Sequence, residues 1–355
     1  MLSLGFMTLN LNSEDQYFTE IAIRAKKHKI TCYRFVPSDI NPLTERVKGE
    51  IFDHTQQEWV QKEFKLPEIL YDRCFYTEDM HSKQCHSIIN WLKTRKDIHF
   101  LGYGLPNKYH IYSHLSQSNL APYFIETKMI HSSSHLIQSL KVDVPIIIKP
   151  ILGSGGFSIY FLKKSASGIL VKTDKMTNQV THLFTTDQQF STWIEPLLST
   201  RQYLMQPYIP LKNKENQPFD IRTLLQKDAE GNWTVVGSGI RMGLPDCIVS
   251  NLQRGATPIH FNDWLKKQPA KLKSYLLEEL NDILPKLPPL LEELFDPLFE
   301  IGVDIGLSQD GSLWILDINS KPGRKVILET NPGLEERLYT APLLYTKALY
   351  TSQIR

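Results

Sequence analysis

The sequence has few cysteines, almost no excess charge and no long hydrophobic run. Its 355 residues include four cysteines with no CxxC pair, which excludes a disulfide-rich scaffold and predicts reduced thiols. Forty Lys and Arg against 38 Asp and Glu give a formal charge of +2, so nucleic acid is not expected as the main partner. No apolar run reaches the roughly 20 residues of a membrane span, and the start MLSLGFMTLNLNSED lacks a signal-peptide pattern. We therefore predict a cytoplasmic protein without a membrane partner.

Two groups of histidines, one of them with cysteines nearby, give no convincing metal site. His81, Cys85 and His86, with Cys74 nearby, could suggest zinc, but their spacing matches none of the usual structural-zinc patterns and a firm fourth ligand is missing. We interpret the remaining candidates as surface or hydrogen-bonded histidines: His110, His114, His131 and His135.

The length of 355 residues predicts about two or three domains, and the hydrophobic content of 41% is enough to build a sizeable core. A βαβ-like start predicts an N-terminal α/β domain over residues 1–104. A run of strands interrupted by one helix predicts a central domain over 105–205, and two strand pairs with helices predict a C-terminal domain over 206–355. The segment KLPPLLEELFDP predicts a break between two helices.

A glycine-rich loop follows an apolar strand in VPIIIKPILGSGGFSIYFLKK. Lys149 ends the strand just before Gly153, Ser154, Gly155 and Gly156, and glycines let backbone N–H groups approach an anion. The residues match neither a Walker loop nor a dinucleotide fingerprint, so we predict strand, glycine loop and strand. Taken alone, these residues fit a phosphate site and an ordinary glycine-rich hairpin about equally well.

A hairpin near the C-terminus carries a stronger signal, EIGVDIGLSQDGSLWILDIN. A two-residue turn at Asp310-Gly311 would place Asp304 opposite Asp317 and Gly302 opposite Asn319. Alternation then puts the two acids and Asn319 on one face, with Ile315 as its apolar exception. The other face is predicted to be core: Ile301, Val303, Ile305, Leu307, Trp314, Leu316 and Ile318.

Two carboxylates opposite each other repel, and a cation would remove that repulsion. Three oxygen donors on one rigid face suit Mg²⁺, and Gly302 and Gly306 leave space beside Asp304. The alternative, a solvated outer face, explains neither these glycines nor the amide of Asn319. The pattern therefore favours a magnesium site.

The order of these parts resembles the ATP-grasp superfamily. Lysine and glycine loop are followed by LMQPYI, FDIR, an arginine strand, SNLQRGA and D(x12)DxN, over about residues 105–325. FDIRTLLQKDAEGNWTVVGSGIRMG and VDIGLSQDGSLWILDINSKPGR are close to the YheC/YheD group, which is associated with bacterial endospore coats. Such a resemblance implies a mixed α/β (α+β) ATP-grasp fold of three α/β domains, with ATP between the central and C-terminal domains.

The resemblance also implies a set of site residues. Phosphate contacts are implied for Lys108 and Lys149, a lid for Gly153, Ser154, Gly155, Gly156, Phe157 and Ser158, an adenine pocket for Gln206, Pro207, Tyr208 and Ile209, a ribose or nucleotide contact for Asp220, and magnesium ligands for Asp304, Asp317 and Asn319. Two positions depart from the family pattern. Pro207 and Asp317 both stand where glutamate is more frequent, and neither change removes the site.

Three arginines remain as candidate catalytic residues, because the fork of a guanidinium suits phosphate or acyl-phosphate oxygens: Arg222, Arg241 and Arg254. For Arg254 a surface salt bridge is an equal alternative. Arg324 is a weaker candidate for binding a substrate carboxylate.

The activity implied is an ATP-dependent ligase that joins a carboxylate to an amine through an acyl-phosphate. Its partners would be a small-molecule or peptide substrate with a carboxylate, an amine co-substrate and spore-coat proteins. The alternative is a structural or scaffolding spore-coat protein that binds ATP without turnover.

Overall fold

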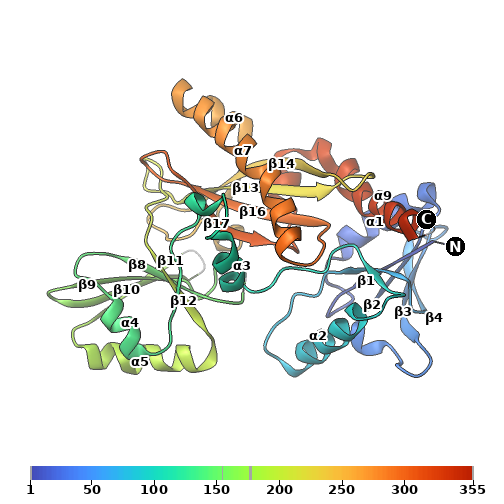
Figure 1. Cartoon of the computed structure of the whole chain (residues 1–355), viewed down its shortest axis with the longest axis horizontal. Helices are drawn as coiled ribbons and strands as arrows, with labels where there is room; N and C mark the ends of the chain where they lie inside the picture. The colour runs from blue at the N-terminus through green and yellow to red at the C-terminus, as the bar shows by residue number, and fades with distance from the viewer. Residues whose placement is uncertain (1, 154, 176–177, 354–355) are drawn as a thin grey trace.

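The computed structural model describes residues 2–153, 155–175 and 178–353, and its three β-sheets define three domains (Figure 1). The strand orders are β4-β3-β2-β1-β5-β6, β11-β10-β9-β8-β12-β7 and β15-β14-β13-β16-β17. Each sheet packs against helices, so the predicted mixed α/β class is confirmed.

The N-terminal domain surrounds a sheet in which β1 runs parallel to β2 and β5. Its elements are β1 (Ser3–Met7), α1 (Asp15–His28), β2 (Thr31–Phe35), β3 (Arg46–Asp53), β4 (Glu58–Lys65), β5 (Ile69–Asp72), α2 (Met80–Lys93) and β6 (His99–Phe100).

The central domain is a mostly antiparallel sheet covered by two helices. Its elements are β7 (Lys128–Met129), α4 (Ser133–Ser139), β8 (Ile146–Pro150), β9 (Tyr160–Ser165), β10 (Gly168–Lys175), β11 (Asn178–Phe184), α5 (Asp187–Thr200) and β12 (Tyr203–Pro207). Strand β8 pairs antiparallel with β9, with Ile148 opposite Tyr160. The predicted order of strand, glycine loop and strand is therefore confirmed.

The C-terminal domain has an antiparallel sheet at the middle of the molecule. Its elements are β13 (Phe219–Lys227), β14 (Trp233–Met242), β15 (Thr257–His260), α6 (Phe261–Lys266), α7 (Ala270–Leu294), β16 (Glu300–Leu307), β17 (Leu313–Asn319), α8 (Lys325–Thr330) and α9 (Glu335–Gln353). In Figure 1, α6 and α7 project beyond the rest of the fold.

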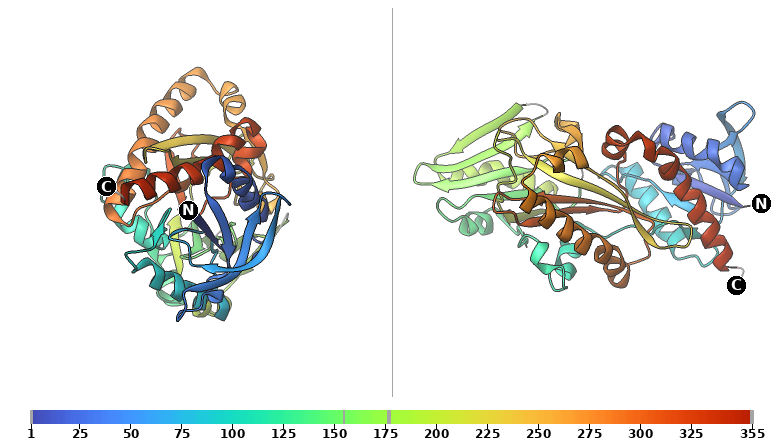
Figure 2. Two further views of the ribbon diagram at one scale, coloured as in Figure 1. Left: turned by 90° about the vertical axis from the view of Figure 1, so that its right-hand side faces the viewer. Right: turned by 90° about the horizontal axis from the view of Figure 1, so that it is seen from above.

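Two helices pack outside the domain that their sequence position suggests. Helix α3 (Lys108–Leu115) contributes Ile111 and Leu115 to the core of the C-terminal domain. Helix α9 packs on α1, as the right-hand view of Figure 2 shows. It contributes Tyr339 and Leu343 to the N-terminal core. The cores therefore join segments that are far apart in the chain.

Helix α7 corrects one prediction. The proline-rich segment does not break it, and the helix continues through Pro285, Pro288 and Pro289. Its apolar face buries Leu284, Leu287 and other leucines in the core. Each interior proline costs roughly 3 kcal/mol of helix propensity, and this burial offsets it.

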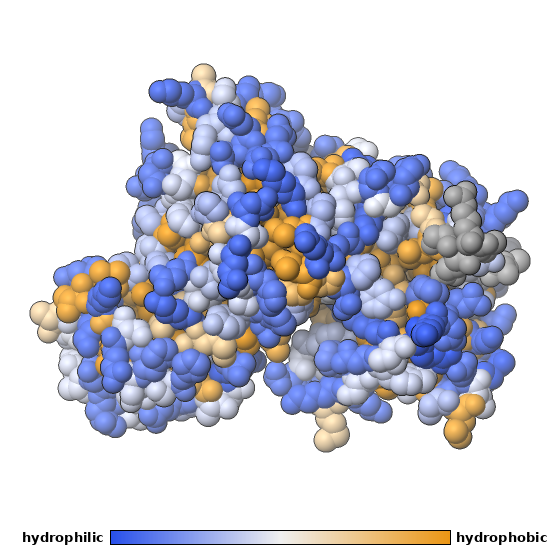
Figure 3. All heavy atoms as spheres, in the orientation of Figure 1, coloured by the Kyte–Doolittle hydropathy of each residue, from blue (hydrophilic) through white to orange (hydrophobic). Residues whose placement is uncertain are grey.

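Among the described residues, no helix is both long and apolar enough to cross a bilayer. The face in Figure 3 is mainly hydrophilic, and apolar side chains gather near its middle.

Candidate active site

The hairpin of β16 and β17 has the predicted register at its functional end. Asp304 lies opposite Asp317 and Gly302 lies opposite Asn319. The turn differs from the prediction, because Ser308 N–H donates to Ser312 O and three residues lie between them. A β-bulge between Ile305 and Asp304 then inserts one extra residue in β17, Leu316. This shift restores the expected pairing of Asp304 with Asp317.

The bulge reverses the predicted positions of several β17 side chains. Ile315, expected on the polar face, lies opposite Ile305 and is buried in the core. Leu316, expected in the core, lines the cavity instead, and Trp314 is only half-buried. The Leu316 carbonyl, at the bulge, accepts a hydrogen bond from Lys149 Nζ at 3.2 Å.

Acids and arginines alternate across the polar face of the sheet. Arg222 lies opposite Asp304 and donates to it at 2.6 Å, and Arg241 Nη2 lies 2.8 Å from the same carboxylate. Arg241 also lies opposite Asp220 and donates twice to it, at 2.7 and 2.9 Å. Burial alone would raise the pKa of Asp304, but the two guanidiniums outweigh it and hold that pKa at about 2.

The space that we attributed to a ligand beside Asp304 is filled by protein. A Cβ on Gly302 would lie 2.6 Å from Arg222 Nη2, and one on Gly306 would lie 2.7 Å from a methyl group of Leu211. The glycines therefore make room for an arginine and a leucine. The interpretation of an uncompensated acid pair is also wrong, because Asp304 is bonded to arginines and Asp317 pairs with Lys108 Nζ at 2.8 Å.

Two lysines lie beside this face. Asn107 caps helix α3 by accepting from His110 N–H, and this places Lys108 at the first position of the helix. Lys149 comes from the end of β8. Burial, together with the nearby Lys108 ammonium, lowers the pKa of Lys149 to about 8.

The donor set fits a magnesium ion next to phosphate oxygens. Asp317 is partly exposed and lines the cavity with Asn319, whose Nδ2 lies 3.2 Å from Asp317 Oδ2. This bond directs the amide nitrogen toward the carboxylate, and the amide and carboxylate oxygens are the hard ligands that Mg²⁺ prefers. Asp304 lines the same cavity, although both its oxygens are bonded to arginines.

The glycine loop has the backbone conformation that glycine allows. Gly153, Gly155 and Gly156 have φ values of 133°, 73° and 71°, and Ser158 has a φ of 58°. Glycine adopts these positive φ values without steric cost, and glycine loops of this kind can turn backbone N–H groups toward an anion. Ser154 was also predicted for this lid and lies outside the described residues.

The end of β12 and the two residues after it are the predicted adenine pocket. Gln206 Nε2 donates to Thr127 Oγ1 at 2.6 Å, and Tyr208 N–H donates to the carbonyl of Pro145 at 3.1 Å. The Tyr208 ring packs edge-on against Phe161. These contacts fix the segment against the central sheet.

A cavity of about 700 Å³ connects these parts, which is a size suited to a nucleotide-sized ligand. The predicted residues that line it are Lys108, Lys149, Gly153, Gly155, Gly156, Phe157, Gln206, Pro207, Tyr208, Ile209, Asp220, Arg222, Arg241, Asp304, Asp317 and Asn319. Among the described residues, Ser158 and Arg254 were predicted for the site but do not line this cavity. Arg254 instead donates to the carbonyl of Asp174.

Sequence reasoning missed several cavity residues. They include Glu14 and Phe75 from the N-terminal domain, and Ser250 and Lys321 from the C-terminal domain. Ser250 is part of the SNLQRGA motif, which gave a signal. Glu14 and Phe75 come from a domain that no motif connected to the site.

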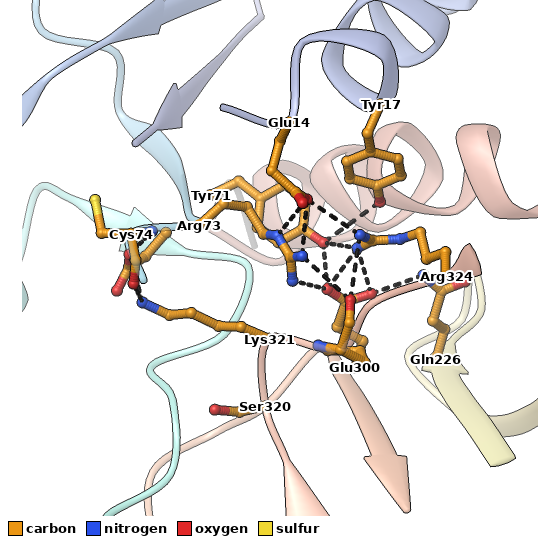
Figure 4. Close-up of polar contacts among 12 residues, drawn as sticks. Glu14, Tyr17, Tyr71, Arg73, Cys74, Gln226, Glu300, Ser320, Lys321 and Arg324 are labelled. Atoms are coloured by element: carbon orange, nitrogen blue, oxygen red, sulfur yellow. Dashed lines mark hydrogen bonds and ion pairs between the residues drawn. The ribbon is translucent and has the colours of Figure 1, made fainter. Parts of the chain in front are cut away.

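Arg324 belongs to a buried ionic network, which Figure 4 shows. It pairs with Glu300 at 2.7 Å and stacks over the Tyr17 ring, while Arg73 bonds to both Glu300 and Glu14. Arg324 is only 6% exposed. Its guanidinium therefore joins the N- and C-terminal domains, in contrast to the substrate role we considered.

The cysteines are free and buried, in line with reduced thiols: Cys32, Cys74, Cys85 and Cys247. Across the described residues, no three His, Cys, Asp or Glu side chains gather as a metal-binding group. His81 Nε2 lies 3.1 Å from the Leu9 carbonyl.

The fold matches solved ATP-grasp structures. D-cycloserine synthetase DcsG aligns with a TM-score of 0.57 and 13% identity, over 98% of this chain and 99% of that one. D-alanyl-alanine synthetase A from Vibrio cholerae aligns with a TM-score of 0.53 and 12% identity, over 97% and 98% of the two chains. At these identities the likeness establishes the ATP-grasp fold.

The sequence establishes the family. Residues 97–349 match the family described as YheC/D like ATP-grasp, so the chain belongs to that family. It is 38% identical to the endospore coat-associated protein YheC of Bacillus subtilis, over 99% of this chain and 97% of YheC. It is 23% identical to YheD of the same organism, over 84% of this chain and 66% of YheD.

Proposed function

We propose that this protein is an ATP- and magnesium-dependent ligase that joins a carboxylate to an amine. The observation that carries the proposal is the convergence, in one cavity, of two lysines, the glycine loop, two arginines and the pair Asp317 and Asn319. The ligase fold of the structural neighbours supports the reaction class. An amino acid or peptide is the proposed carboxylate substrate.

The reaction transfers the γ-phosphoryl group of ATP to a carboxylate oxygen and releases ADP. The amine then attacks the acyl carbon, phosphate leaves with the C–O electron pair, and the amine loses a proton. Lys108 and Lys149 face the phosphoryl group and neutralise its charge. Arg222 and Arg241 stabilise the tetrahedral oxyanion, and the glycine loop keeps water from the acyl-phosphate.

Asp317 and Asn319 would hold the magnesium ion, which supplies charge neutralisation at the phosphates. Asp304 keeps Arg222 and Arg241 in place from the same face, because it is bonded to both. Asp220 fixes Arg241 from the other side. A magnesium ligand and the oxyanion-binding arginines thus share one rigid sheet.

The name of YheC supports a proposed place in spore-coat formation, with coat proteins as partners and the cytoplasm as the place of synthesis and action. A second candidate function is a scaffolding protein that binds ATP without turnover.

The test combines binding with turnover. Calorimetry with ATP and Mg²⁺ should show metal-dependent binding, and amino-acid and peptide pools should then stimulate ADP release and yield a product that is one water lighter than its two substrates. Absence of nucleotide binding would refute both candidates. Binding without stimulated ADP release in any pool would favour the scaffold.

A further inference from the structure

A loop between β14 and β15 covers one wall of the cavity and is held by two domains. We call residues 244–256 the cover loop. Its segment 248–253 lines the cavity. Within the C-terminal domain, Ser250 Oγ donates to the carboxylate of Asp220.

The central domain holds the same loop through one carboxylate. Asp174 is near the end of β10, and its Oδ2 accepts from the N–H groups of Ile248 and Val249 at 2.8 and 3.0 Å. Arg254, in the cover loop, donates in return to the Asp174 carbonyl. A third contact joins Gln179 Nε2 to the Asp246 carbonyl at 2.7 Å.

The glycine loop rests on the cover loop as well. The Arg254 guanidinium lies 4.8 Å from the centre of the Phe157 ring. A Cβ on Gly155 would lie 2.3 Å from Gln253 Oε1, and one on Gly156 would lie 3.3 Å from Val249 Cγ2. The lid therefore lies directly against the cover loop at both glycines, and a side chain at either position would require Gln253 or Val249 to shift.

Asp174 and Arg254 are buried, and each has one polar side-chain atom without a hydrogen-bond partner among the described residues. They are 4% and 7% exposed, and among the described residues Asp174 Oδ1 and Arg254 Nε have no hydrogen-bond partner. Buried charged groups with unsatisfied atoms carry a penalty that water removes when the contact opens. The contact is thus suited to open and close.

We propose that Asp174 and Arg254 are positioning residues that latch the cover loop over the bound nucleotide. The identity of the nucleotide rests on the proposed function. Asp174 holds the backbone next to Ser250, Ser250 bonds Asp220, and Asp220 orients Arg241, so closure of the cover loop is connected to the oxyanion-binding arginine. Arg254, predicted as catalytic, acts through this loop.

The first test measures dissociation of a fluorescent ATP analogue with Mg²⁺, chased by unlabelled ATP. Asp174→Ala and Arg254→Ala should each release it about tenfold faster, since a hydrogen bond to a charged group contributes about that factor. Asp174→Asn keeps a side-chain acceptor and should stay close to the wild type. Asp187→Ala, an exposed acid of the same domain, is the matched control. An unchanged dissociation rate in Asp174→Ala, or lost turnover with unchanged dissociation in Arg254→Ala, would overturn the latch.

A second test does not depend on nucleotide binding. Amide hydrogen exchange over residues 244–256 of the nucleotide-free protein should be faster in Asp174→Ala than in the wild type, Asp174→Asn or Asp187→Ala. Equal exchange would refute the latch. Faster exchange in a protein that binds no nucleotide would support the latch and reject the proposed ligase, so the two hypotheses fail separately.

Discussion

Arg222 and Asp304 lie directly opposite each other on β13 and β16 and are bonded at 2.6 Å. Because of this pairing, the two acids that face each other across β16 and β17 have different electrostatic environments. Asp304 is neutralised by protein, with Arg241 as its second partner, whereas Asp317 is bonded to the more flexible Lys108. The two acids should therefore respond differently to substitution.

Replacing Asp304 with Asn should destabilise the protein strongly. The substitution leaves Arg222 and Arg241 buried with one carboxylate fewer, and breaking a buried pair in this way costs about 3–5 kcal/mol. Chemical denaturation of the nucleotide-free protein measures this loss. A loss below 1 kcal/mol would mean that the arginines find other partners.

Replacing Asp317 with Asn should have a small effect on stability, less than about 1 kcal/mol, because its pair with Lys108 is partly exposed. The same change removes an anionic ligand, so magnesium-dependent ATP binding should fall sharply. Calorimetry with and without Mg²⁺ separates the two effects. Unchanged Mg-ATP affinity would exclude Asp317 as a ligand.

Lys149 predicts proton uptake on nucleotide binding. Its pKa is lowered from 10.5 to about 8 in the folded protein, so at pH 9 most of the nucleotide-free protein has a neutral amine there. Phosphate anions favour the charged form and should restore the proton, whereas at pH 6.5 the lysine is already charged. Calorimetry at pH 9 in two buffers of different ionisation enthalpy should show uptake of nearly one proton. Lys149→Arg, always charged, should show none.

The same pKa shift has a consequence for stability. The folded state holds the Lys149 proton more weakly than the unfolded chain does, so this group destabilises the fold at neutral pH. Its penalty declines as the pH rises from about 8 toward 10.5. Lys149→Met should therefore stabilise the nucleotide-free protein at pH 7 more than at pH 10.

Gly155 and Gly311 form a matched pair for testing the lid. Both have positive φ, 73° and 92°, so alanine costs about 1–2 kcal/mol of backbone strain at either position. Only at Gly155 would the added Cβ also meet Gln253, because nothing lies within 4 Å at Gly311. Gly155→Ala should weaken ATP binding about tenfold or more, while Gly311→Ala should lower stability alone. Equal ATP affinities would show that the lid does not contact the nucleotide.

Glu300 tests the domain junction. Glu300→Gln removes the charge between Arg73 and Arg324 and should cost about 3–5 kcal/mol. Thermal unfolding, followed by circular dichroism, measures this loss. Equal melting of variant and wild type would show that the junction is not stabilised by this network.

The sequence was informative where chemistry is local. Lys149 with its glycines and the acids of β16 and β17 follow short patterns, and the structure brings them to one cavity. The pairing of Asp304 with Asp317 was predicted correctly, but from a two-residue turn that does not exist. The longer turn shifts the register by one residue, and the bulge shifts it back. The alternation of side chains along one strand cannot reveal such a bulge.

Pairing across distant strands could not be predicted. The neutralisation of Asp304 depends on β13 lying beside β16, which brings together residues 82 positions apart. Arg254 and Arg324 also carried no local signal that their partners would be Asp174 and Glu300. Arginine motifs predict that an anion is near, and tertiary contacts decide which anion it is.

Helix α9 sets the order in which the protein can be completed during synthesis. The N-terminal sheet leaves the ribosome first, yet its core includes Tyr339 and Leu343, which are made more than 230 residues after β6. Until they arrive, the part of α1 that packs on α9 is uncovered, and the Tyr17 ring lacks its contact with Tyr339. The first domain to be translated is therefore among the last to finish folding. A nascent chain stalled before α9 would expose hydrophobic surface to which chaperones bind.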